Sequence, residues 1–149
     1  MALNVTRETI KKKCRISVSD FDSEIDALIS EQLPVIEFAI LQEHIDDTGN
    51  VGLQATLNLG AAEVIAGEFL AQAHREPGAS ESLYFAEVSF GTRPPSGFGA
   101  TIADPFGLKE QGWKRLAPYL KPQVRSHLAT DTSIRSKTSK LDEEEITRW

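Results

Sequence analysis

The amino-acid sequence predicts a mainly α-helical protein, a small bundle in which two long helices lie between a short N-terminal and a short C-terminal helix. In two long stretches, apolar residues recur every three or four positions, the spacing that places them on one face of a helix. The length of 149 residues suits one domain with an appendage, and 40% hydrophobic and 26% charged residues are typical of a globular chain. We expect a helical core over residues 1–122 and a polar tail, ordered only on a partner, over 123–149.

The first helix is predicted directly after Thr6, since threonine is a residue type that caps helix N-termini. Ile10 and Cys14 lie four positions apart and therefore share one face, which we expect to be buried. The lysines between them are expected to point outward.

The first long helix is predicted from the acidic turn near residue 21 to about Ile45. Pro34 lies inside this pattern. Because proline removes one backbone hydrogen bond and clashes with the preceding turn, we expect a kink there or two helices that meet at residues 32–33.

The second long helix is predicted over residues 53–73, and one side of it is rich in small residues. Glycine costs about 1 kcal/mol relative to alanine in an exposed helix interior, so its presence indicates the close approach of another helix. We assign Gly60, Ala61, Val64 and Gly67 to packing against a neighbouring copy of the chain. The alternative is that they pack the core of a single chain.

A β-hairpin with a long loop is predicted at about residues 82–106, where strand-like residues precede a segment rich in glycine and proline. Such a segment is typical of a functional loop, with Arg93, Pro94, Pro95 and Phe98 at its tip. A short helix over residues 109–120 follows. The residues predicted to form the core are Ile25, Leu28, Ile29, Leu57, Phe69, Trp113, Leu116 and Tyr119.

Motifs for catalysis or cofactor binding do not stand out in the sequence. One cysteine and three scattered histidines do not make a zinc motif, and neither a phosphate-binding glycine loop nor a serine-hydrolase motif is found. We therefore expect no catalytic residue, no cofactor, no metal site and no enzymatic activity. No run of 18 apolar residues occurs, so no membrane-spanning segment is predicted.

The net charge of −6 is unevenly distributed. Residues 1–17 carry +4, residues 18–108 carry −13, residues 109–140 carry +6 and residues 141–149 carry −3. An acidic molecule is a poor general DNA-coating protein. Basic ends and an acidic middle suit contacts between neighbouring copies, although the same pattern is also expected of a merely soluble chain.

Over residues 5–120, the order and spacing of these segments resemble the head–tail connector, or adaptor, proteins of long-tailed bacteriophages. The resemblance runs from TRETIKKKCRI and SDFDSEID through ALISEQLPVIEFAI and ATLNLGAAEVIAGEFLAQ to GWKRLAPYL. Its best single match is the closing element Leu116–Ala117–Pro118–Tyr119. Pro34 departs from the uninterrupted helix of such proteins, and the loop and tail make this chain longer than the shortest members.

The resemblance implies a virion protein that forms a ring, usually of twelve copies, beneath the portal protein at the capsid vertex. Such a ring is assembled in the host cytoplasm, extends the DNA channel without binding DNA specifically, and offers its far side to a stopper or tail-terminator protein. The loop around Arg93 is then expected at the channel or at the tail-facing rim. The C-terminal tail of the chain is expected to dock on the portal protein through Arg125, Arg135, Lys137 and Trp149.

Three other interpretations remain open. The first is a small helical regulator that binds nucleic acid through Lys11–Arg15 or through residues 109–140, although three consecutive lysines fan out around a helix instead of sharing one face. The second is a tail-completion or stopper protein, a class commonly richer in β-structure. A small enzyme ranks last, because no site stands out.

Overall fold

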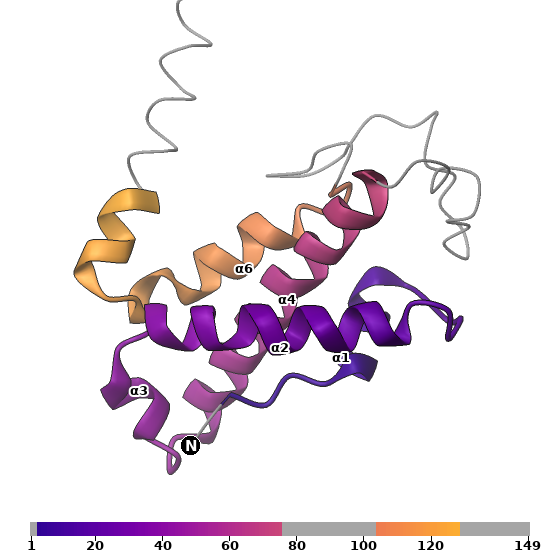
Figure 1. Cartoon of the computed structure of the whole chain (residues 1–149). Coiled ribbons are helices and arrows are strands. Elements are labelled where there is room, and N and C mark those ends of the chain that lie inside the picture. The colour runs from indigo at the N-terminus through magenta and orange to yellow at the C-terminus, as the bar shows by residue number, and fades with distance from the viewer. Residues whose placement is uncertain (1–2, 76–103, 129–149) are drawn as a thin grey trace, which may run out of the picture. The chain divides into compact units, whose positions relative to one another are not determined.

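The computed structural model describes residues 3–75 and 104–128, and every regular element in these ranges is a helix (Figure 1). The prediction of a mainly α-helical protein is therefore confirmed. The β-hairpin predicted at about 82–106 is not supported: residues up to 103 lie outside the described ranges, and residues 104–106 form a turn. The elements are α1 (Arg7–Cys14), α2 (Asp22–Ala39), α3 (Gln42–Asp46), α4 (Val51–Arg75), α6 (Leu108–Leu116) and the 3-10 helix η1 (Ala117–Tyr119).

The chain divides into two compact units, Met1–Tyr119 and Leu120–Trp149. All the labelled helices belong to the first unit. Residues 122–128 of the second unit are helical, so the first part of the predicted tail has secondary structure in the single chain.

Helix α1 forms as its sequence predicts. Thr6 has extended backbone angles and its hydroxyl accepts a hydrogen bond from the backbone N–H of Thr9, which caps the helix. Ile10 and Cys14 are fully buried. Arg15 ends the helix in the left-handed conformation, with φ 57°, and its N–H donates to carbonyls of the last turn.

Helix α2 continues through Pro34, so of the two outcomes expected there, a kink or two helices that meet at residues 32–33, the second is wrong. Proline lacks only the N–H that would bond to the carbonyl of Ser30, and Ser30 is exposed, so water can satisfy this carbonyl. The helix ends instead at Ala39, because Ile40 is extended and buried and the N–H of Leu41 donates to the carbonyl of Tyr119 at 2.9 Å. The short helix α3 follows as a separate element.

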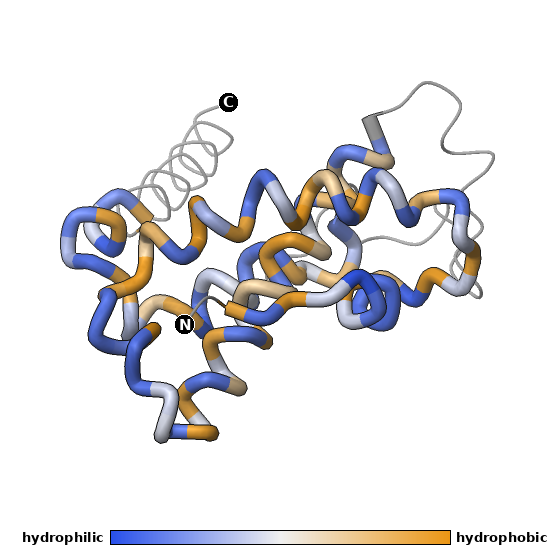
Figure 2. Tube along the Cα trace, turned by 60° about the horizontal axis from the view of Figure 1, so that its bottom comes forward, coloured by the Kyte–Doolittle hydropathy of each residue, from blue (hydrophilic) through white to orange (hydrophobic). Residues whose placement is uncertain are grey.

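Helix α4 lies at the centre of the first unit and contacts α1, α2, α3 and α6; Figure 1 shows it passing behind α2. The aromatic rings of Phe21 and Phe69 meet edge to face, with centroids 5.7 Å apart. In Figure 2 apolar and polar residues are interspersed along the helices, as expected where one face is buried and the other is exposed.

The predicted core is largely confirmed. Five of its members are buried, whereas Ile29, Trp113 and Tyr119 are only partly buried. Tyr119 lies in η1, where its ring meets that of His44 edge to face at 5.3 Å. The buried members are Ile25, Leu28, Leu57, Phe69 and Leu116.

Candidate functional site

The small-residue face of α4 packs against α6 of the same chain. A Cβ atom on Gly67 would lie 2.4 Å from the backbone nitrogen of Lys109, and one on Gly112 would lie 2.6 Å from the carbonyl oxygen of Gly60. Ala61 and Val64 are buried in this same helix. The prediction that another helix approaches closely is thus confirmed for Gly60 and Gly67, and that helix is α6 of the same chain. This favours the alternative, in which these residues pack the core of a single chain, over an interface between copies.

A buried carboxylate joins three helices of the core. Glu63 of α4 has only 4% of its side chain exposed and accepts from Lys13 of α1 at 3.0 Å and from Arg115 of α6 at 3.0 Å. A buried carboxylate needs such cationic partners to offset its desolvation. The sequence did not indicate this cluster, because Lys13 and Arg115 are 50 and 52 positions away from Glu63 in the sequence.

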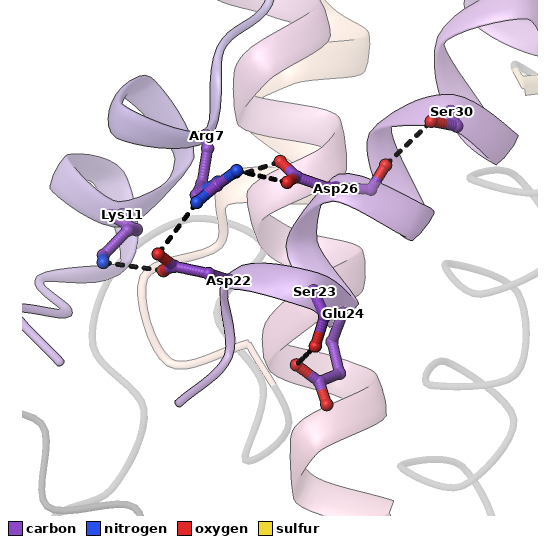
Figure 3. A network of polar contacts seen from close by, with 7 residues as sticks. All are labelled: Arg7, Lys11, Asp22, Ser23, Glu24, Asp26 and Ser30. Atoms are coloured by element: carbon purple, nitrogen blue, oxygen red, sulfur yellow. Dashed lines mark hydrogen bonds and ion pairs between the residues drawn. The ribbon is translucent and has the colours of Figure 1, made fainter. Parts of the chain in front are cut away.

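A second ionic network connects α1 with α2 (Figure 3). Arg7 donates to Asp22 at 2.9 Å and makes a two-pronged contact with Asp26, while the ammonium group of Lys11 lies 2.8 Å from Asp22. The hydrogen bond from Lys11, followed by that from Arg7, lowers the pKa of Asp22 below its ordinary value. The expectation that the lysines of this helix point outward is therefore wrong for Lys11, which is buried.

The two networks engage much of the basic charge of the N-terminal segment inside the molecule. Arg7, Lys11 and Lys13 are paired with carboxylates, whereas Lys12 and Arg15 are exposed. The Arg15 guanidinium lies 5.6 Å from the centre of the Phe106 ring, a distance typical of a cation–π contact. Part of the uneven charge of the sequence therefore forms ion pairs within a single chain.

The outer face of α2 is the most unusual exposed surface in the described part of the chain. Val35 and Phe38 are 58% and 74% exposed. Carboxylates flank them, since residues 20–47 contain nine Asp or Glu and no Lys or Arg. The opposite face of the helix is buried against the core. We define the outer α2 face as six of the exposed residues of this helix, Glu24, Ala27, Glu31, Pro34, Val35 and Phe38.

The sequence contained a signal for this face. A helical wheel drawn through residues 22–39 places Phe38 away from Ile25, Leu28 and Ile36, whereas Val35 lies seven positions after Leu28 and therefore at the edge of the buried face. The predicted core omits both residues, but an apolar side chain within a helical pattern is ordinarily buried, so the pattern alone does not predict that Val35 and Phe38 are exposed.

The remaining predicted site residues lie elsewhere. Arg125 is exposed and belongs to the helical residues 122–128 of the second unit. The loop and tail candidates Arg93, Pro94, Pro95, Phe98, Arg135, Lys137 and Trp149 lie outside the described residues.

In residues 3–75 and 104–128, no three His, Cys, Asp or Glu side chains are grouped in a way that would hold a metal ion. The helices of these ranges include none with the length and apolarity to cross a membrane. Cys14 is buried, and this burial, with a smaller contribution from Asp104, raises the pKa of its thiol to about 12.

No protein-family model, no curated protein and no solved structure matches the chain. The fold and the exposed surface described above are therefore what a functional proposal has to build on.

Proposed function

We propose that the chain is a head–tail connector, or adaptor, protein of a long-tailed bacteriophage. In this proposal, copies of the chain, usually twelve in such rings, assemble beneath the portal protein at the capsid vertex. The ring extends the DNA channel and presents its far side to a stopper or tail-terminator protein. Its place is the neck of the virion, and its assembly occurs in the host cytoplasm.

The observation that carries the proposal is the outer α2 face. A small protein whose small-residue helix is already covered by α6 still exposes Val35 and Phe38 beside the carboxylates Glu24 and Glu31. An apolar patch with a charged surround is the composition of protein–protein contact surfaces. This supports an assembly role, and the sequence resemblance supplies the kind of assembly.

The acidic character of the chain fits a channel through which DNA passes. Residues 20–47 contain nine carboxylates and no Lys or Arg, and those not paired with Arg7 or Lys11 repel a phosphate backbone, so DNA gains nothing there from the release of counterions. The main alternative is a regulator that binds nucleic acid through Lys11–Arg15. This alternative is less favoured, because Lys11 and Lys13 are paired with Asp22 and Glu63.

The test uses DNA-filled, portal-bearing heads of the phage whose genome encodes the chain, produced without this protein. The purified full-length chain is added, and electron microscopy together with tail joining is the readout. We expect new density beneath the portal and recovery of infectious particles when tails are supplied. Heads that remain unchanged at saturating protein would contradict the proposal.

A salt titration with duplex DNA separates the main alternative. A regulator binds a specific duplex with affinity that falls steeply as salt rises, whereas a connector shows almost no such binding. Specific and salt-dependent binding would favour the regulator over the connector.

A further inference from the structure

A second exposed surface lies where α1 turns toward α2. Residues 11–18 contain four cations and no carboxylate, and two of these cations, Lys12 and Arg15, are exposed. Val18, in the same turn, is 49% exposed. We call Lys12, Arg15 and Val18 the basic corner. It combines positive charge with an apolar side chain, the complement of the outer α2 face.

The basic corner and the apolar residues of the outer α2 face lie at opposite ends of one rigid element. The basic corner precedes the first residue of α2, whereas Val35 and Phe38 lie in its last turns. A helix of 18 residues is about 27 Å long at 1.5 Å per residue. Figure 1 shows the α1–α2 connection and the α3 end of α2 on opposite sides of the first unit.

This separation decides the symmetry of a contact between identical chains. Two different patches that meet, one from each copy, make a head-to-tail contact, and its repetition closes a ring when the rotation fits. Val35 and Phe38 alone, meeting the same residues of a second copy, would instead give a two-fold dimer and would bring the acidic α2 regions of the two copies together. Like charges are disfavoured at such a contact.

We propose that the outer α2 face of one copy binds the basic corner of the next copy in a head-to-tail contact. Val35 and Phe38 pack against Val18 and against the aliphatic stems of the basic side chains. Glu31 faces Lys12 and Arg15, which sets the register of the contact. The inference rests on the ring of the proposed function and names the surfaces that form it.

The test joins single introduced cysteines across the contact. Val18→Cys and Phe38→Cys are made in separate chains, one of which carries an affinity tag, and the two are mixed at high concentration with a short bismaleimide. The native thiol does not interfere, because Cys14 is buried and its pKa is raised to about 12. Both replaced side chains are substantially exposed, and circular dichroism checks that the variants fold.

We expect the tagged–untagged dimer to form several-fold faster in the Val18→Cys and Phe38→Cys mixture than in a control mixture of Val18→Cys and Glu43→Cys. Glu43 is a matched choice because its side chain is exposed but lies on α3, off the outer α2 face. Equal rates in the two mixtures would overturn the proposal. So would faster linkage of Phe38→Cys with itself, the result expected of a two-fold dimer.

Charge reversal provides a second readout. Glu31→Lys in the Phe38→Cys chain is expected to slow the linkage several-fold, and Lys12→Glu in the Val18→Cys chain to restore much of the rate. Glu43→Lys changes the net charge equally and serves as the control. A slowing of the same size by Glu43→Lys, or the absence of restoration, would contradict the assigned pairing.

The two proposals fail in different ways. Preferential linkage of the free protein, together with heads that do not bind it, leaves the contact standing and refutes the connector function. Heads that bind the chain and join tails, together with equal linkage rates, leave the function standing and refute the contact.

Discussion

Replacing Gly67 with alanine is expected to destabilise the protein, although the same change ordinarily stabilises a helix. Alanine is favoured over glycine by about 1 kcal/mol in a helix interior. Here the new methyl group would lie 2.4 Å from the backbone nitrogen of Lys109, 2.7 Å from its Cβ and 2.8 Å from a carboxylate oxygen of Asp104. Because the nearest atom belongs to the backbone, rotation of a side chain cannot relieve the contact.

The magnitude follows from the displacement required. To restore an ordinary contact distance, α4 and α6 have to separate locally by roughly 1 Å, which is overpacking of the kind that costs about 1–3 kcal/mol. After the gain in helix propensity of about 1 kcal/mol is subtracted, the net loss lies in the range of about 0–2 kcal/mol, and we expect a value of about 1 kcal/mol. In the unit Met1–Tyr119 this lowers Tm by about 4–8 °C.

Urea unfolding followed by circular dichroism, with a thermal scan, measures this change. Gly52 provides the matched control, since it lies in the first turn of α4 and a Cβ there would meet only Asn50, at 3.7 Å. Gly52→Ala is expected to leave stability unchanged or raise it by up to about 1 kcal/mol. A Gly67→Ala variant as stable as the wild-type protein would refute the close approach of the two helices.

Three further outcomes are expected. Glu63→Gln removes a buried charge between two cations and is expected to lower the free energy of unfolding by about 1–3 kcal/mol in urea titrations. The loss is smaller than for a fully buried pair, because the two cations are partly exposed. An unchanged urea midpoint would refute this expectation. The lowered pKa of Asp22 contributes stability that is present above pH about 4 and is lost as the pH falls through the folded-state value, so denaturant midpoints of Asp22→Asn should decline less below pH 4 than those of wild type. The Cys14 thiol is expected to react slowly with a thiol reagent at pH 8 in the native protein and rapidly in urea, and rapid labelling of the native protein would contradict its burial. The stability of the protein should fall as the pH rises above about 8.5, because only the thiol of the unfolded chain ionises there.

Local features of the sequence predicted local features of the structure. Thr6 caps α1, Ile10 and Cys14 share its buried face, and the small residues around Gly60 and Gly67 mark a helix that another helix approaches closely. Each of these depends on chemistry within a few neighbouring positions. The helix periodicity likewise placed most of the core correctly.

Features that depend on distant residues were not predictable in the same way. Gly67 signals a close neighbour but carries no information on whether that neighbour is α6 or a second copy. The end of α2 was placed too late, because its termination depends on the hydrogen bond between Leu41 and Tyr119, nearly 80 positions away. Pro34 predicts a kink or a break, yet α2 continues through it, because an exposed proline inside a helix that packs on its other face leaves only one solvent-facing carbonyl without its partner.

The charges available to a partner are those that do not form ion pairs within the chain. Arg7 and Lys11 neutralise Asp22 and Asp26 along one edge of α2, so the acids that remain available to a partner are those on the opposite edge. On that edge Glu31 lies one turn from Val35. An exposed ion pair alone contributes little to binding, so the apolar side chains have to supply most of the affinity. The charged side chains determine which partner is bound. A substitution at Val35 should therefore weaken association at every ionic strength, whereas one at Glu31 should matter most at low salt.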